Sequence, residues 1–252
     1  MSSVNIIGVK GIPIVKEGDD LGGIICEFAE RQGNPIQEDD IVVVTHKVVS
    51  KAEGRVVRLG DVRPSPFAMT VSKRVRKEPE LVELILREAR SVVRMGDGHL
   101  ITETRHGWVC ANSAIDKSNV SGGDSVALLP VDPDESARRI RERIRELTGK
   151  RVAVIISDTF GRPLREGHVD IAIGVAGIDP MYDRRGEKDI FGYVMRVKQA
   201  AIADELASAA ELVIGNVREM VPVAIIRGYK YPLNEAARAR RLIRPRRRDL
   251  FI

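Results

Sequence analysis

Six short apolar runs, rich in the β-branched residues Val and Ile, constrain the fold of this chain more than any other feature. They are Ile41 to Thr45, Gly107 to Ala111, Val126 to Leu129, Arg151 to Ser157, Ile171 to Val175 and Val221 to Arg227. Gly, Asp or Pro bounds these runs, and such punctuation is typical of β-strands. We therefore predict a strand at each run.

Three other segments have helical character: Glu80 to Arg90, Asp134 to Gly149 and Ala200 to Leu212. The second is the clearest, because acidic residues begin it, apolar residues recur at helical spacing, and a glycine ends it. Strands and helices are mixed without strict alternation, and several strands look hairpin-connected. The sequence therefore predicts an α+β fold, with mixed sheets and packed helices.

No internal repeat, low-complexity tract or Pro/Ser-rich linker divides the 252 residues. We therefore expect residues 1–252 to form one domain, built as one unit or as two tightly packed subdomains.

Composition indicates a soluble protein that stays inside the cell. The chain is 43% hydrophobic, yet no apolar run approaches the roughly 20 residues that a membrane helix needs. The N-terminus lacks the basic and apolar regions of a signal peptide, and the two cysteines do not suggest a disulfide framework. We expect a cytoplasmic location. The net charge of +5 suits an anionic small molecule as well as nucleic acid.

Common catalytic motifs are missing. The sequence contains no G-x-x-x-x-G-K-[ST] phosphate loop, no G-x-G-x-x-G after a strand, no H-E-x-x-H and no G-x-S-x-G. A nucleotide, if bound, is therefore held by a less common arrangement.

The segment RVAVIISDTFGRPLREG, residues 151–167, is the most informative. Its strand ends at Asp158 and Thr159, whose oxygens suit Mg²⁺ or Mn²⁺, and the following turn carries Arg162 and Arg165, which suit phosphate or carboxylate. From this segment alone, an aspartate that caps the turn and arginines in solvent are the favoured interpretation.

A second segment, HGWVCANSAIDKSNV (residues 106–120), again runs from a strand into an aspartate, Asp116, followed by Asn119. An aspartate in such a loop more often forms a turn than binds a metal. Two strand ends that each deliver an aspartate could nevertheless hold a divalent ion, which phosphoryl transfer from a nucleotide normally requires.

The C-terminal stretch Ala236 to Leu250 carries an arginine cluster and raises the alternative of an RNA-associated protein. Arginines without interleaved aromatic residues contact phosphates but stack on no bases. A surface tail or a contact between subunits is therefore favoured, and nucleic acid is not the expected partner.

Taken together, the segments resemble one family, the coenzyme F420-0:L-glutamate ligases, also called F420 gamma-glutamyl ligases. The matching stretches are GIPI, VVSKAEGR, HGWVCANSAIDKSNV, LLPVDPDESARRIRERI, VAVIISDTFGRPLREGHVDIAIGVAGIDP, ADELASAAELVIG, VPVAIIRG and ARRLIRPRRRDLF. They span nearly the full chain in the family's order, and SDTFGRPLREG is highly specific. The chain resembles the stand-alone form of the family, without a fused flavin-binding domain.

The resemblance implies the family's own α+β fold, a homodimer and a GTP-dependent amide ligase. Such an enzyme activates the terminal carboxylate of F420-0 as an acyl phosphate. The amine of L-glutamate then displaces phosphate, and a second, γ-linked glutamate follows. The implied cofactors are Mn²⁺ or Mg²⁺, as two ions, together with K⁺.

The resemblance also implies roles for individual residues. Metal ligands would be Asp116, Asp158, Thr159 and Asn216. GTP contacts would come from Gly11, Ile12, Pro13, Ile14, Val15, His46, Lys47, Lys51 and Asn119, and from the loop Ile214, Gly215, Asn216, Val217, Arg218, Glu219, Met220 and Val221. Charge and placement make Arg162 and Arg165 the candidate catalytic residues.

At Asn216 the sequence departs from the family, because some relatives carry a metal-binding glutamate there. An amide oxygen can ligate Mg²⁺ but brings no charge. An alternative of the same fold is a GTP-dependent ligase that acts on a different carboxylate metabolite.

Overall fold

The computed structural model describes residues 3–96, 98–120, 122–215 and 217–250. Its centre is a five-stranded sheet in the order β1-β12-β2-β8-β9. The strands are β1 (Asn5–Gly8), β12 (Val223–Arg227), β2 (Ile41–Thr45), β8 (Ala153–Gly161) and β9 (His168–Ala176). β2 and β8 are parallel, and the other neighbours in this sheet are antiparallel. The mixed strands and helices confirm the predicted α+β class.

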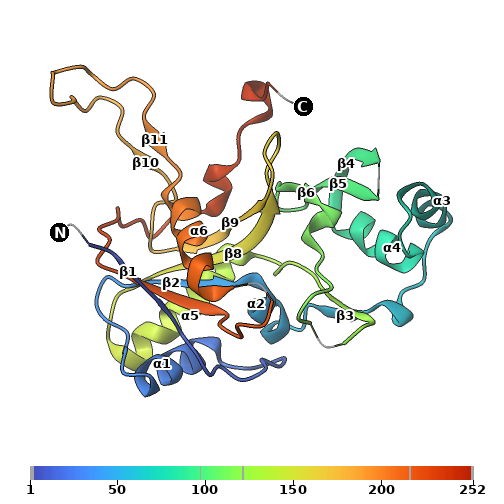
Figure 1. Ribbon diagram of the computed structural model, residues 1–252, viewed down its shortest axis with the longest axis horizontal. Helices are drawn as coiled ribbons and strands as arrows, with labels where there is room; N and C mark the ends of the chain where they lie inside the picture. Colours follow the sequence, from blue (N-terminus) through green and yellow to red (C-terminus); the bar gives the residue numbers. More distant parts are fainter. Residues whose placement is uncertain (1–2, 97, 121, 216, 251–252) are drawn as a thin grey trace.

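Helices cover both faces of this sheet, and its central strands are therefore buried on both sides. α5 (Pro133–Thr148) packs on β8 and β9, and α1 (Leu21–Arg31) packs on α5. α6 (Ile202–Ile214) covers the other face (Figure 1). α2 (His46–Ala52) begins directly where β2 ends.

A second hydrophobic cluster lies at one end of the molecule (Figure 1). It packs α3 (Pro66–Val75) and α4 (Pro79–Glu88) against short strands. These strands are β3 (Val56–Arg58), which pairs with β7 (Ser125–Ala127), and the sheet of β4 (Ala89–Gly96), β5 (His99–Thr104) and β6 (Val109–Ala111). Short 3-10 turns, η1 (Leu59–Asp61) and η2 (Asn112–Ala114), connect these elements.

Two segments extend from the body, as Figure 1 shows. Residues 182–200, named the arm below, leave and return through the paired strands β10 (Tyr182–Asp183) and β11 (Gln199–Ala200). The C-terminal segment, residues 236–250, contains the 3-10 turns η3 (Ala239–Leu242) and η4 (Arg246–Arg248). Among the residues described, no helix combines the length and the apolar character needed to span a bilayer.

All six predicted strands and all three predicted helices are present, with ends shifted by a few residues. Asp132 caps α5 by accepting a hydrogen bond from the Glu135 amide, and Gly149 ends the helix in a left-handed conformation. The predicted helix Glu80 to Arg90 stops at Glu88, because the chain turns there into the strand β4.

Gly174 marks the closest approach of α5 to the sheet. A Cβ atom built on Gly174 would lie 2.4 Å from the Pro133 carbonyl oxygen at the start of α5. Backbone cannot move aside as a flexible side chain can. Only glycine therefore allows this contact.

We expect Gly174→Ala to lower the free energy of unfolding by about 1–3 kcal/mol, because overpacking displaces α5 from β9. Denaturation in guanidinium chloride measures this change. Gly161→Ala is the matched control. Gly161 ends β8, next to the turn that joins β8 to β9, and the nearest atom to a Cβ built there would lie 3.9 Å away. Equal unfolding midpoints for the two variants would contradict the argument.

Candidate active site

The parallel pairing of β2 with β8 brings the first site residues together where β2 ends, while β8 continues to Gly161 beside β9. Thr45 pairs with Ser157 in this register, so His46 and Asp158 follow at the same edge of the sheet. Open sheets commonly bind ligands beyond the carboxyl ends of their strands.

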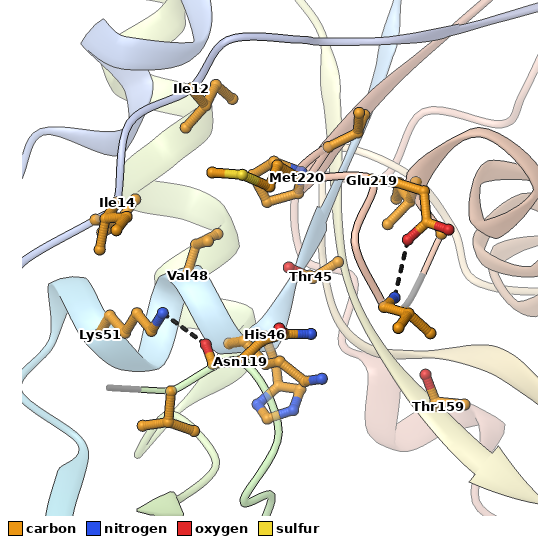
Figure 2. Close-up of a pocket in the computed structure, with 18 of the residues that line it drawn as sticks. Ile12, Ile14, Thr45, His46, Val48, Lys51, Asn119, Thr159, Glu219 and Met220 are labelled. Atoms are coloured by element: carbon orange, nitrogen blue, oxygen red, sulfur yellow. Dashed lines mark hydrogen bonds between the residues drawn. The ribbon is translucent and has the colours of Figure 1, made fainter. Parts of the chain in front are cut away.

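A cavity of about 540 Å³ opens at this edge. Most of the predicted site residues line it: Ile12, Pro13, Ile14, Val15, His46, Lys47, Lys51, Asn119, Asp158, Thr159, Ile214, Gly215, Val217, Glu219, Met220 and Val221. Figure 2 shows Ile12, Ile14 and Met220 on one side of the cavity, and Lys51, His46 and Thr159 on the other. The cavity therefore has an apolar side and a polar side.

Asp158 is held at the polar side by its neighbours. Its Oδ1 accepts a hydrogen bond of 2.8 Å from the Thr159 amide and lies 3.2 Å from Nε2 of the buried His46. The angles of the second contact do not meet those of a hydrogen bond, and His46 Nε2 has no other partner among the described residues. A buried polar atom without a partner beside a carboxylate is typical of a site that a ligand completes.

Asp170 is a site residue that the sequence analysis missed. It lies in β9 opposite Thr159, and its carboxylate accepts hydrogen bonds from the hydroxyls of Ser157 (3.0 Å) and Thr159 (2.7 Å). Burial raises the pKa of Asp170, and the charge of Asp158 adds to the rise. A carboxylate within the apolar run HVDIAIGVA was the signal available in the sequence.

Asp116 is close to the cavity but does not line it. Lys47 Nζ lies 2.8 Å from Asp116 Oδ2, and the Ser118 amide donates to Oδ1 at 2.7 Å. Burial alone would raise the pKa of Asp116, but the hydrogen bond and the charge of Lys47 bring it below its ordinary value. Asp116 therefore balances Lys47, and its role as a metal ligand stays a prediction.

Lys51 places a positive charge in the cavity. Its Nζ donates a hydrogen bond of 2.7 Å to the Asn119 carbonyl oxygen, as Figure 2 shows. Partial burial lowers the pKa of Lys51, and the charge of Lys47 lowers it further. Two lysines that repel each other in a half-buried site would be stabilised by an anion.

The loop after α6 closes another side of the cavity. The Glu219 carboxylate accepts hydrogen bonds from the amides of Val217 (2.9 Å) and Arg218 (2.8 Å), and these bonds lower its pKa. Glu219 thus folds the loop on itself and leaves Val217 and Met220 exposed. Asn216 lies outside the described residues.

Several predicted residues do not line the cavity, namely Gly11, Arg218, Arg162 and Arg165. The two candidate catalytic arginines lie in the turn between β8 and β9, where Arg162 donates to the carbonyl oxygens of Glu166 and Gly167. Their catalytic role stays a prediction.

The polar side fits a divalent cation that also binds phosphate. Asp158, Asp170 and Thr159 supply oxygen atoms, whereas no cluster of three or more acidic, His or Cys ligands occurs in the part of the chain that the structure describes. Mg²⁺ usually binds one or two carboxylates together with substrate phosphates, rather than a complete protein cage. The residues present therefore fit such an ion.

Comparisons with known proteins agree with the resemblance drawn from the motifs. A sequence model of the family described as F420-0:Gamma-glutamyl ligase matches residues 9–228. The chain is 46% identical to the Coenzyme F420:L-glutamate ligase of Methanothermobacter thermautotrophicus over 98% of each chain, and 46% identical to that of Methanopyrus kandleri over the full length of both. It is 41% identical to that of Archaeoglobus fulgidus over 89% of this chain and 88% of the relative. The chain therefore belongs to the F420-0:Gamma-glutamyl ligase family, a family of ligases.

Proposed function

We propose that this protein is a GTP-dependent ligase that joins L-glutamate to coenzyme F420-0 through an amide bond. The observation that carries the proposal is the cavity at the ends of β2 and β8, which combines the carboxylates of Asp158 and Asp170 with the cations Lys47 and Lys51. The name of the relatives, Coenzyme F420:L-glutamate ligase, supports the two substrates to be joined.

The chemistry explains why a nucleotide is needed. A carboxylate acylates an amine poorly, because its leaving group would be oxide. In the proposed reaction a carboxylate oxygen of F420-0 attacks the γ-phosphorus of GTP, and the bond to GDP breaks. The glutamate amine then attacks the acyl carbon, gives up a proton, and phosphate leaves. A second cycle at the γ-carboxylate of the added residue gives the diglutamyl product.

The two sides of the cavity suit the two parts of GTP. Residues 12–15 and the lining residues Ile214, Gly215, Val217, Met220 and Val221 supply apolar side chains and backbone groups, which suit the base and ribose. Lys47, Lys51 and Lys117 line the same cavity and would neutralise the phosphates.

The proposed metal is Mg²⁺ or Mn²⁺, which would neutralise phosphoryl charge during transfer. Asp158, Thr159 and Asp170 would hold it. We propose Asp116 and Asn216 as ligands of a second ion, for which Asp116 would exchange its bond to Lys47. A K⁺ ion completes the proposed set, as the family resemblance implies.

We also propose a homodimer. Ile190 and Phe191, at the end of the arm, are 91% and 89% exposed, which is unusual for large apolar side chains that have no partner surface. A second copy of the chain would cover them.

Asp158→Asn tests the proposed function, because it removes the carboxylate charge at nearly constant shape. We expect wild-type protein with F420-0, L-glutamate, GTP and Mn²⁺ to give mono- and diglutamyl F420 by mass spectrometry. In the variant kcat should fall by about 10²–10³. Asp61→Asn, an exposed carboxylate outside the cavity, is the matched control and should change kcat less than twofold.

The same assay has two outcomes that contradict the proposal. If wild-type protein gives no product while GTP still raises its melting temperature, the acceptor is a different carboxylate metabolite. If GTP has no effect on melting either, the nucleotide assignment is wrong as well.

The arm predicts the oligomeric state. We expect wild-type protein to sediment as a dimer, and the double variant Ile190→Asp, Phe191→Asp to sediment as a monomer, because burial of two charges at the interface is unfavourable. Leu212→Asp, on α6 and 80% exposed, is the control and should remain dimeric. A monomeric wild-type protein would refute the proposal.

A further inference from the structure

A second, larger cavity lies away from the site described above. Its volume is about 1200 Å³, and it is enclosed by the end of β5, the base of the arm and the C-terminal segment. Eight arginines line it, against a single lining carboxylate, that of Glu103. We name it the basic cavity.

Four of these arginines pair with three carboxylates. Arg90 and Arg246 share Glu103, at 3.5 and 2.6 Å. Arg185 pairs with Asp183, and Arg241 pairs with Asp179.

The other four arginines are Arg105, Arg240, Arg244 and Arg248. Within the described parts of the chain, none of these four makes an ion pair or a side-chain hydrogen bond. The basic cavity therefore gathers four guanidinium groups that no carboxylate of the described residues pairs with.

The C-terminal segment is anchored, so these arginines are not on a loose tail. The Ala239 amide donates a hydrogen bond of 2.9 Å to the buried Asp134, and Ala237 and Ala239 are buried in the main core. Arg238 pairs with Asp132 at 3.1 Å. These contacts fix the backbone that carries Arg240 and Arg244, which reduces the entropy lost when a ligand binds.

His106 also lines the basic cavity, and its ring is fixed by the backbone. Its Nε2 lies 3.0 and 3.1 Å from the carbonyl oxygens of Pro130 and Val131, so Nε2 carries the proton. The other ring nitrogen, Nδ1, is buried and has no hydrogen-bond partner among the described residues.

We propose that the basic cavity is a second binding site, for a small molecule that carries two or more phosphate or carboxylate groups. Guanidinium groups bind both kinds of anion through paired hydrogen bonds. Nucleic acid is a poorer candidate, because no Phe, Tyr or Trp among the described residues lines the cavity to stack on bases.

This chemistry has two sources. One is an inorganic oligophosphate, and the other is the anionic acceptor or its glutamylated product, an assignment that rests on the proposed function. The acceptor could extend from one cavity to the other, because the two cavities are close together. β5 and β6 form a hairpin, and Gly107 in its turn lines the basic cavity. β6, which carries Cys110, contacts β8, the strand that carries Asp158 of the first cavity. Gly107 and Cys110 are three positions apart in the chain, which spans at most roughly 10 Å.

Calorimetric titration with sodium tripolyphosphate tests the site. We expect the double variant Arg105→Gln, Arg244→Gln to raise Kd about tenfold or more, since each substitution removes a charge-assisted bond. Arg247→Gln, in the same C-terminal segment but outside the lining, should change Kd less than twofold. Lys51→Gln reports any tripolyphosphate bound in the first cavity and should leave the arginine-dependent binding in place.

Three results would overturn the proposal. Equal loss of binding in Arg247→Gln would show diffuse surface attraction only. Binding lost in Lys51→Gln and kept in the double variant would assign the anion to the first cavity. The third result is a double variant that has an unchanged melting temperature and still binds tripolyphosphate, but no longer binds RNA or no longer forms a dimer. The cavity would then bind a macromolecule.

The KM of F420-0 distinguishes the two sources. A rise of about tenfold in the double variant, with kcat little changed, would identify the acceptor as the natural ligand. An unchanged KM beside lost tripolyphosphate binding would identify the inorganic anion. If wild-type protein glutamylates nothing, the proposed function fails, whereas the titration still decides whether the anion site exists.

Discussion

The parallel pairing of β2 with β8 is the constraint on which the first cavity depends. The other adjacent strands of the central sheet are antiparallel, so β2 and β8 are the neighbouring pair in this sheet that runs in the same direction toward this edge. His46 and Asp158 meet there because Thr45 pairs with Ser157. A slip of one residue would turn one of the two side chains to the opposite face, and the burial of both strands prevents such a slip.

Much of the fold could be predicted from local patterns. The apolar runs were long enough to identify the core strands, and the caps of α5 were visible as Asp132 and Gly149. Other elements gave weaker signals. α1 contains two glycines that disfavour a helix, yet Gly22 allows close packing on Arg143 of α5. Tertiary packing, which the sequence does not display, decides such cases.

The candidate site was predictable where one strand end carried the signal, as at Asp158, and not where two strands had to be aligned. Asp170 enters the site through its register with Thr159, which no local pattern specifies. In the sequence, Asp116 and Asp158 both look like acidic residues that follow a strand. In the structure Asp116 pairs with Lys47 beside the cavity, whereas Asp158 lines the cavity. Charge and placement predicted Arg162 and Arg165, and the structure puts both in the turn between β8 and β9, outside the lining of the first cavity.

The C-terminal arginines show how an interpretation changes once the backbone path is known. As a run in the sequence they favoured a surface tail or a subunit contact over RNA binding, because no aromatic residues are interleaved to stack on bases. The hydrogen bond from Ala239 to Asp134 instead ties the segment to the start of α5, and Asp134 also accepts from the Val175 amide in β9. One buried carboxylate thus joins the helix, the sheet and the C-terminal segment. Five arginines of this segment therefore line a cavity on a backbone that the core positions, and this fixed array is the basis of the proposed selection of an anion by geometry as well as by charge.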